Sequence, residues 1–227
     1  MFNNLEGFGP IYVLNLERSP ERRAQMLAEF EKHGITDFSF ISAIDGTKDF
    51  QLQGVNIQQN KNIRPVENAC AASHLLALEH WLSTNDSLYA IFFEDDISFE
   101  LVEKWKFSWK EILQQVPDTF DTLQMCPIRT HWESDHIGLR PRDISNDWGA
   151  GAYVIHREYA QHLLSKHLQI KTFVNMDVSE NLLFSSPNAY VYTLFVENAT
   201  NETTMVGRDN HTGVHTNSRN EVLKFWN

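Results

Sequence analysis

Three consecutive acidic residues, Glu94, Asp95 and Asp96, are the side chains of this sequence that point most clearly to chemistry. They directly follow an apolar run at residues 88–93, which is typical of a buried strand. Adjacent carboxylates repel one another unless a positive charge lies among them. In an extended chain, residues two apart point the same way, so Glu94 and Asp96 could share one cation. Such oxygen ligands suit Mg²⁺ or Mn²⁺. The alternative is a solvated acidic turn that caps a helix starting near Leu101.

A group of arginines, Arg18, Arg22 and Arg23, follows a second apolar run at residues 11–16. Because Ser19 and Pro20 are typical of a helix start, Arg18 and the amino end of this helix are expected to face the end of the strand. Helix amino ends and arginine side chains both bind phosphate. In the alternative, Arg22 and Arg23 pair with glutamates on the helix surface. Acids and arginines together suggest a nucleoside diphosphate ligand, without deciding between glycosyl transfer, nucleotidyl transfer and hydrolysis.

The sequence lacks several other nucleotide and hydrolase motifs. It has no GxxxxGK[ST], no GxGxxG after the first apolar run, no HExxH and no GxSxG, which argues against P-loop proteins, dinucleotide oxidoreductases, zincins and α/β-hydrolases.

Cys70 and His74 lie four residues apart, but two ligands are an incomplete site for a soft metal. His211 and His215 could complete a metal site, although surface histidines are the alternative.

The elements that position these residues alternate between strand and helix. We expect strands at residues 11–16, 38–41, 88–93, 121–125 and 149–155, and helices at residues 20–33, 69–82, 101–115 and 157–167. The segments 47–66 and 127–147 are expected to be loops, and 198–220 a polar stretch. Strand, helix and strand with short joins predict an α/β fold with a parallel sheet. Ligands of such sheets bind beyond the carboxyl ends of the strands.

Length and charge narrow the class of protein further. The 227 residues are expected to form one domain. A formal net charge of −11 argues against nucleic-acid binding and against a polybasic membrane patch. Cys70 and Cys126 are too few for a disulfide framework. No signal peptide or membrane-spanning segment is predicted, so the expected location is the cytoplasm, with at most transient contact with a membrane surface.

Five short blocks of the sequence, in order, resemble glycosyltransferase family 25. They cover residues 11–165, and although each alone is weak, the ordered set is specific. In the third block Ala69 stands where the family has glycine. The blocks are a strand leading into Asn15-Leu16 with Arg18 and Arg22, then Ala43-Ile44-Asp45-Gly46, Cys70-Ala71-Ala72-Ser73-His74, Glu94-Asp95-Asp96 after a strand, and Gly151-Ala152-Tyr153 before a helix.

The resemblance implies a GT-A-like domain with a central, mostly parallel sheet flanked by helices. Its nucleotide-binding half would cover about residues 11–100 and its acceptor half about residues 101–227. The family includes lipooligosaccharide and lipopolysaccharide galactosyltransferases, and relatives that galactosylate collagen. The implied activity is therefore inverting transfer of a hexose, galactose first, from a UDP-sugar to a saccharide acceptor.

The resemblance also implies roles for individual residues. Asp96 would bind Mn²⁺ or Mg²⁺ at the donor diphosphate, with Glu94 and His215 as further metal ligands. Ser73 and His74 are expected to form hydrogen bonds near the donor pocket. The complete set of expected donor-binding residues is Asn15, Leu16, Arg18, Arg22, Asp45, Ser73, His74, Glu94 and Asp95.

Inversion requires a general base that takes the proton of the acceptor hydroxyl. The candidate is Asp177, because the family often has an acid after an apolar residue here; alternatively it caps a helix at residues 178–184. Asp147 is the reserve candidate. Two other functions stay open: a nucleotidyltransferase, and a non-catalytic module of the same fold that binds a nucleotide-sugar.

Overall fold

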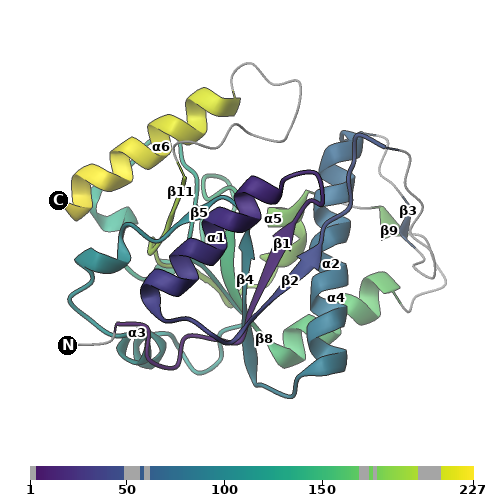
Figure 1. The fold of residues 1–227 in the computed structure, drawn as a ribbon, viewed down its shortest axis with the longest axis horizontal. Coiled ribbons are helices and arrows are strands. Elements are labelled where there is room, and N and C mark those ends of the chain that lie inside the picture. The colour runs from purple at the N-terminus through teal and green to yellow at the C-terminus, as the bar shows by residue number, and fades with distance from the viewer. Residues whose placement is uncertain (1–3, 49–56, 59–61, 169–173, 176–177, 199–210) are drawn as a thin grey trace.

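The computed structural model describes residues 4–48, 57–58, 62–168, 174–175, 178–198 and 211–227. Its centre is a seven-stranded sheet in the order β2-β1-β4-β8-β6-β10-β7. Figure 1 labels β1, β2, β4 and β8 of this sheet. The strands are β1 (Ile11–Asn15), β2 (Phe38–Ser42), β4 (Tyr89–Glu94), β6 (Thr122–Gln124), β7 (Arg140–Pro141), β8 (Ala152–His156) and β10 (Ala189–Val191).

The direction of the strands makes this sheet mostly parallel. β2, β1 and β4 pair in parallel, as do β6 and β10, whereas β8 lies antiparallel between β4 and β6, and β7 is antiparallel at the edge. The predicted α/β class with a central, mostly parallel sheet is therefore confirmed. Two further two-stranded sheets join β5 (Ile97–Ser98) to β11 (Val196–Glu197), and β3 (Ile57–Gln58) to β9 (Val174–Asn175).

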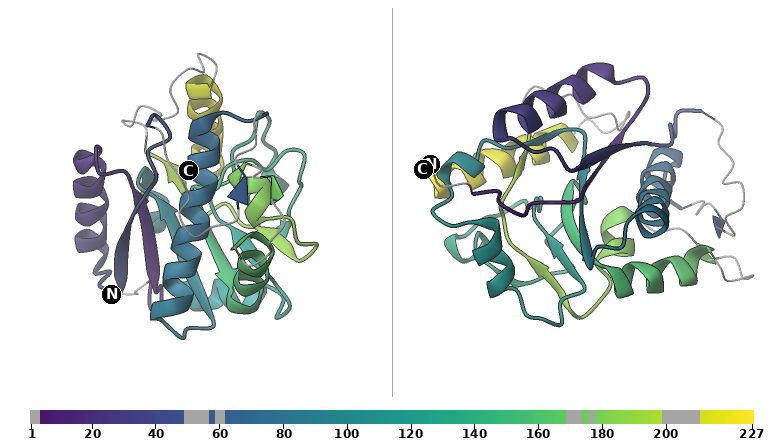
Figure 2. Two further views of the ribbon diagram at one scale, coloured as in Figure 1. Left: turned by 90° about the vertical axis from the view of Figure 1, so that its right-hand side faces the viewer. Right: turned by 60° about the horizontal axis from the view of Figure 1, so that its bottom comes forward.

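Helices cover both faces of the central sheet (Figures 1 and 2). α1 and α3 pack on one face, and α2, α4 and α5 on the other. Both layers are needed because β1 and β4 carry apolar side chains on both faces, which would otherwise be exposed. The helices are α1 (Pro20–His33), α2 (Pro65–Thr84), α3 (Trp109–Gln115), α4 (Arg157–Leu168), α5 (Ser179–Leu183) and α6 (His211–Trp226).

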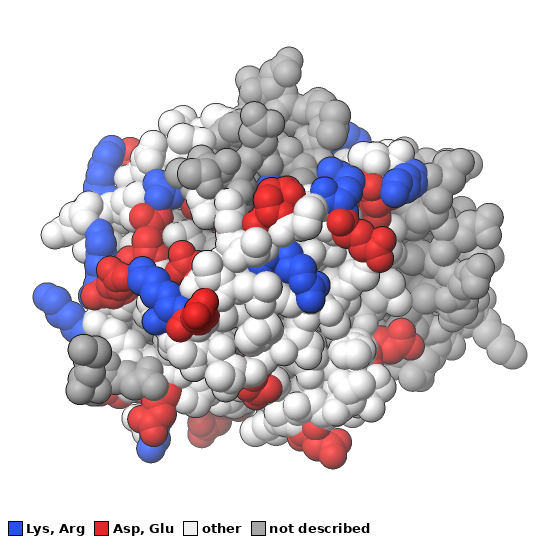
Figure 3. All heavy atoms as spheres, in the orientation of Figure 1, with Lys and Arg blue, Asp and Glu red and all other residues white. Residues whose placement is uncertain are grey.

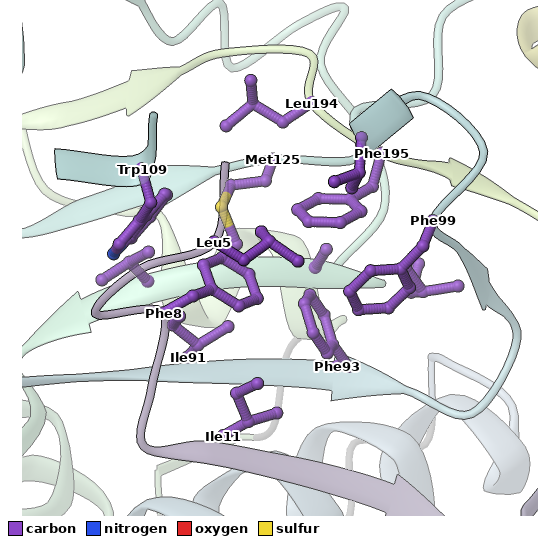
Figure 4. Packing of buried hydrophobic residues seen from close by; sticks show 14 of the residues in the cluster. Leu5, Phe8, Ile11, Ile91, Phe93, Phe99, Trp109, Met125, Leu194 and Phe195 are labelled. Carbon is purple, nitrogen blue, oxygen red and sulfur yellow. The ribbon is translucent and has the colours of Figure 1, made fainter. Parts of the chain in front are cut away.

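An aromatic cluster fixes the end of β4 that precedes the three acids. Phe93 lies edge-on to Phe99 and Phe195, with ring centroids 5.6 and 5.2 Å apart (Figure 4). Phe8 meets Trp109 edge-to-face at 4.9 Å. Such pairs add about 0.5–1.5 kcal/mol each beyond the area that they bury. The strand that carries the acids is therefore held rigidly.

The start and end of α1 follow their sequence signals. Pro20 begins the helix and Gly34 ends it in the left-handed conformation, at φ 66°. Met26 and Phe30 of this helix are buried. Leu27 lies one position round the helix from Met26 and is 40% exposed.

Two expectations for secondary structure were wrong. The helix expected at residues 101–115 is a short 3₁₀ turn, Val102–Lys104, followed by α3, which Ser108 caps by accepting a hydrogen bond from the Glu111 amide. The polar stretch at 198–220 contains the start of α6. Few apolar residues mark that helix, and it is held by contacts remote in sequence, such as the hydrogen bond from Trp132 to Ser218.

Charges of both signs share the surface. On the face drawn in Figure 3, the lysine and arginine side chains lie among aspartates and glutamates rather than in one continuous basic area. In the part of the chain that the structure describes, no helix is both long and apolar enough to cross a bilayer.

Candidate functional site

The candidate site lies at the carboxyl ends of β1 and β4. Leu14 of β1 is the register partner of Glu94 of β4, so the residues that follow each strand come together. Asn15 donates a hydrogen bond from Nδ2 to Asp95 Oδ2 at 2.7 Å, and a second one to the Ser19 carbonyl at 3.1 Å. Asn15 thereby links the acidic segment to the beginning of α1.

Arg22 in the first turns of α1 supplies a positive charge to the acidic segment. Its Nη1 donates to Asp95 Oδ1 at 2.8 Å and to Asp96 Oδ2 at 3.1 Å, and the residue is buried. Burial alone lowers the pKa of Arg22, but Asp96 and Asp95 outweigh burial and raise it. Arg22 is thus the buried counter-ion of two carboxylates rather than a surface residue.

Of the three acids, Asp96 has the least compensation of its charge by hydrogen bonds and positive side chains. Its Oδ1 is buried, and no group of the described residues forms a hydrogen bond with it. The pKa of Asp96 is raised well above its usual range, first by burial and then by Glu197 and Glu94, and Arg22 compensates only in part. A buried carboxylate oxygen with a deficit of positive charge fits a divalent cation with hard oxygen ligands.

Glu94 points in another direction, toward α2. Its Oε1 lies 3.3 Å from His74 Nε2 and accepts a longer hydrogen bond, 3.8 Å, from Cys70 Sγ. Burial raises the pKa of Glu94, but the hydrogen bond and charge of His74 outweigh it, so the pKa is lowered. Burial and then Glu94 raise the pKa of the Cys70 thiol well above its usual range.

The expectation that Glu94 and Asp96 face one cation therefore does not describe their arrangement. Glu94 ends β4, whereas Asp95 and Asp96 form a turn before β5, so the alternation of an extended chain stops at Glu94. Among the described residues, two groups of three offer ligand atoms within 4.8 Å of one another: Cys70, His74 and Glu94, and the more exposed Glu133, Asp135 and His136. Asp96, Glu94 and His215 do not form such a group.

Two cavities meet at this point. The larger, of about 500 Å³, and the smaller, of about 100 Å³, share Cys70 and Glu94 in their walls. The smaller cavity is lined by all but one of the predicted donor-binding residues: Leu16, Arg18, Arg22, Asp45, Ser73, His74, Glu94 and Asp95. Leu14 also lines it and was not predicted, whereas Asn15 lies at the adjoining strand end instead of in the wall.

The wall of the smaller cavity is built by a loop pressed against α2. Ser73 Oγ accepts a hydrogen bond from the Ile44 amide at 2.8 Å and donates one to the Ala69 carbonyl at 2.7 Å. Gly46 packs so closely that an added Cβ would lie 2.5 Å from Val66 Cα and 2.8 Å from Ala69 Cβ. The glycine after Asp45 is therefore required by this close contact.

A polar pair lies at the rim of the same cavity. Arg18 Nε donates to Asp45 Oδ2 at 3.1 Å, while Asp45 Oδ1 accepts from the amide and hydroxyl of Thr47. The side chain of Arg18 is 40% exposed, so it can turn toward a ligand at little cost. The hydrogen bonds of Thr47, followed by the charge of Arg18, lower the pKa of Asp45 despite its partial burial.

Besides Glu67, Cys70 and Glu94, the larger cavity is bounded by residues from the second half of the chain. Its wall includes residues 148–151, 178–180, Glu197 and His215. His215 Nδ1 lies 2.6 Å from Glu197 Oε2. Burial lowers the pKa of His215, but Glu197 raises it by more. Glu180 and Glu197 were missed by the sequence reasoning, because neither belongs to a recognisable motif.

The two candidates for the general base differ in their setting. Asp177 lies outside the described residues, although residues 178–180 border the larger cavity. Asp147 is completely buried; Arg140 donates to both of its oxygens at 2.6 Å, and Arg129 also binds it. Burial raises the pKa of Asp147, but Arg140 and the other donors outweigh it. A carboxylate engaged in this way has the surroundings of a structural residue and does not suit proton transfer to a substrate.

Known proteins share the sequence pattern of this chain. The sequence model of the family described as Glycosyltransferase family 25 (LPS biosynthesis protein) matches residues 8–179. A protein of Aedes aegypti called "Glycosyltransferase 25 family member" is 33% identical over an alignment of 105 residues, and the match covers 41% of this chain and 17% of that protein. The chain thus spans well under two thirds of the length of this relative.

Two solved structures resemble this chain in part. The A197 protein from STIV has a TM-score of 0.47 at 12% identity, with 82% of each chain covered. A mutant of a Drosophila β-1,4-galactosyltransferase 7, in complex with manganese, UDP-Gal and xylobiose, has a TM-score of 0.42 at 10% identity; 91% of this chain and 74% of that chain are covered.

Proposed function

Because this chain belongs to glycosyltransferase family 25, we propose that it transfers a hexose, with galactose as the first candidate, from a UDP-sugar to a saccharide acceptor. The acceptor would be a lipooligosaccharide, a lipopolysaccharide or another glycan. The observation that carries this proposal is the buried Asp96 Oδ1, for which the described residues provide no hydrogen-bond partner. Asp96 follows directly on Glu94, which lines both cavities, and Asp95, which lines the smaller one.

The smaller cavity suits the nucleotide part of the donor. Arg18 at its rim can release Asp45 and approach a phosphate, since arginine binds phosphate through two parallel hydrogen bonds. Asp45 would then accept hydrogen bonds from the ribose. Leu16 and Val66 supply apolar surface for the base. The larger cavity, which shares Glu94 with the smaller one, would hold the sugar and the acceptor.

The chain's own residues fit a hard divalent cation at Asp96. Asp96 would hold Mn²⁺ or Mg²⁺, and Glu94 and His215 would have to turn toward it to become further ligands. When bound, such an ion stabilises the negative charge that develops on the leaving diphosphate. Arg22 offsets part of the repulsion between Asp95 and Asp96, and Glu197 orients His215.

Proton transfer is assigned to Asp177, in keeping with an inverting reaction. The carboxylate would accept the proton of the acceptor hydroxyl on the face of the sugar opposite the diphosphate. The neighbouring Val178, Ser179 and Glu180 line the larger cavity, which is where an acceptor would approach the donor. The support for assigning proton transfer to Asp177 is that it directly precedes these cavity-lining residues in the sequence.

A donor screen by thermal unfolding tests the proposal. A UDP-sugar that binds only the native protein, present at 100 times its Kd, adds about 2.7 kcal/mol to the free energy of unfolding. For a chain of this size that is an increase in Tm of about 5–10 °C. We expect the increase with Mn²⁺ and its loss with a chelator. If no UDP-sugar changes the Tm in either condition, the proposed donor class is wrong.

A further inference from the structure

A second group of metal-ligating side chains lies on the α2 side of the site. Cys70 and His74 are one turn apart on α2 and face the carboxylate of Glu94 at the end of β4. One ligand atom from each of the three residues lies within 4.8 Å of the other two. The sequence alone offered only the pair on the helix; the packing of α2 against β4 adds the third ligand.

We propose that Cys70, His74 and Glu94 form a binding site for Zn²⁺, different from the hard-cation site at Asp96, with which it shares Glu94 alone. Sulfur, imidazole nitrogen and carboxylate oxygen are the three ligand types that Zn²⁺ takes in proteins. A thiolate ligand disfavours Mg²⁺ and Mn²⁺, so the two sites differ in the metal they select. This proposal does not depend on the transferase reaction.

Tyr153 supplies the outer partner that a zinc-binding histidine requires. His74 is completely buried, and its Nδ1 lies 3.1 Å from the Tyr153 hydroxyl, while its Nε2 faces Glu94. A hydroxyl can donate or accept. Without metal, the Tyr153 hydroxyl can donate to His74 Nδ1, so that the proton of His74 is on Nε2 and binds Glu94. With metal, the hydroxyl can accept from Nδ1–H, which leaves the Nε2 lone pair free to bind the ion. The histidine therefore needs no rearrangement of its surroundings to become a ligand.

The fourth coordination position faces the larger cavity. Cys70 and Glu94 both line that cavity, and the Ser179 hydroxyl, 3.2 Å from Cys70 Sγ, lies beside them. Three protein ligands with a position open to water or a small ligand are the pattern of exchangeable zinc sites, as opposed to closed structural sites with four protein ligands. Because Glu94 also borders the smaller cavity, zinc bound here would hold this carboxylate away from the nucleotide side.

Cobalt substitution tests the site directly and uses the full chain without UDP or acceptor. Metal-free protein is titrated with Co²⁺ alone, and the thiolate-to-cobalt charge-transfer band in the near ultraviolet is recorded. We expect the band in the wild type, its removal by added Zn²⁺, and its loss in Cys70→Ser. Cys126→Ser is the matched control, since Cys126 is the other cysteine and lies buried in the core. It should keep the band, as should Asp96→Asn.

The affinity for Zn²⁺ alone separates a metal site from a hydrogen-bond network. Equilibrium dialysis should give one Zn²⁺ per chain for the wild type, and Tyr153→Phe should weaken binding about 10-fold or more through the lost outer partner. No thiolate band in the wild type, or a band that survives in Cys70→Ser, would overturn the proposal. So would loss of the band in Asp96→Asn.

X-ray absorption of the zinc-loaded wild type keeps the proposal open to refutation if Cys70→Ser does not fold. The expected spectrum has one sulfur at about 2.3 Å and nitrogen or oxygen neighbours at about 2.0–2.2 Å. A spectrum without a sulfur neighbour contradicts the site. Failure in these measurements leaves the donor-binding result untouched, and a protein that binds no UDP-sugar can still give the cobalt band.

Discussion

Asn15 ends β1 and Asp95 directly follows the adjacent parallel strand β4, and the Asn15 amide donates to Asp95 Oδ2 at 2.7 Å. Arg22 takes the other oxygen of Asp95 at 2.8 Å. Both carboxylate oxygens of Asp95 therefore accept hydrogen bonds that link the end of β4 to β1 and α1. This leaves Asp96, whose Oδ1 has no hydrogen-bond partner in the part of the chain that the structure describes, as the acid suited to a metal ion.

Replacing Asp95 should destabilise the protein. Asp95→Ala removes a buried partner of Arg22 and leaves the Asn15 amide without its acceptor. Breaking a buried ion pair costs about 3–5 kcal/mol, and the lower end is expected because Arg22 keeps Asp96. Urea unfolding measures the change. Asp118→Ala, at an exposed position, is the control and should change the free energy of unfolding by less than about 0.5 kcal/mol. An equally small effect for Asp95→Ala would contradict its role as an anchor.

Replacing Asp96 should affect ligand binding and spare the fold. Asp96→Ala is expected to lose Mn²⁺-dependent binding of UDP, because the ion loses its principal ligand. Titration calorimetry with UDP, with and without Mn²⁺, measures this. Asp86→Ala, at an exposed position in a turn, is the control. Binding of wild-type strength in Asp96→Ala would refute the metal assignment.

The pair of His215 and Glu197 should make stability depend on pH. The pKa of His215 is raised in the folded state, since Glu197 outweighs the effect of burial. The imidazolium therefore stabilises the folded protein fully below the unfolded pKa of about 6.5, and this contribution is lost as the pH rises through the folded value.

The check is the free energy of unfolding of the wild type and of His215→Gln, measured without metal from about pH 5.5 upward. The difference between them should be largest at low pH and shrink above about pH 6.5. His131→Gln, in an exposed loop, serves as the control. A difference that stays constant across this range would show that the ion pair contributes nothing.

A methyl group at Gly46 should disturb the smaller cavity. In Gly46→Ala the new Cβ would lie 2.5 Å from Val66 Cα, so the loop at 43–46 must move away from α2. We expect a loss of about 1–3 kcal/mol in stability and weaker binding of UDP. Gly138→Ala, where nothing lies within 4 Å of an added Cβ, is the control. Unchanged UDP binding in Gly46→Ala would mean that this loop does not hold the nucleotide.

Replacing the proposed general base should separate binding from transfer. Asp177→Asn is expected to keep donor binding and to lower kcat of transfer by about 10²–10⁴, the usual contribution of a general base. Glu180→Gln is a useful comparison, since Glu180 lines the larger cavity three residues further along. Unchanged transfer in Asp177→Asn would place the base elsewhere, and loss in Glu180→Gln alone would point to Glu180.

Local patterns predicted the elements that carry the site. The continuous apolar runs at β1 and β4 mark strands buried on both faces, and Pro20 and Gly34 mark the ends of α1. The residues that follow these strands therefore came together as expected, from Asn15 to Asp95.

Contacts between distant segments could not be predicted in the same way. The Glu94 side chain points toward His74 because β4 ends at Glu94 and α2 packs beside it. The alternation of side chains along a strand contains no information about either feature. Glu197 reaches the site through the pairing of β11 with β5, a contact between segments about a hundred residues apart. The sequence of α6 carries few apolar residues, and its packing depends on the distant Trp132.

Anomalous diffraction from a crystal soaked with Mn²⁺ and UDP tests the central claim most directly. We predict a manganese peak at coordination distance from the Asp96 carboxylate, about 2.0–2.3 Å, with the diphosphate on the ion and the uridine in the cavity beside Arg18 and Asp45. UDP density in that cavity with no manganese at Asp96 would contradict the metal assignment. An empty cavity at saturating UDP would contradict the donor site itself.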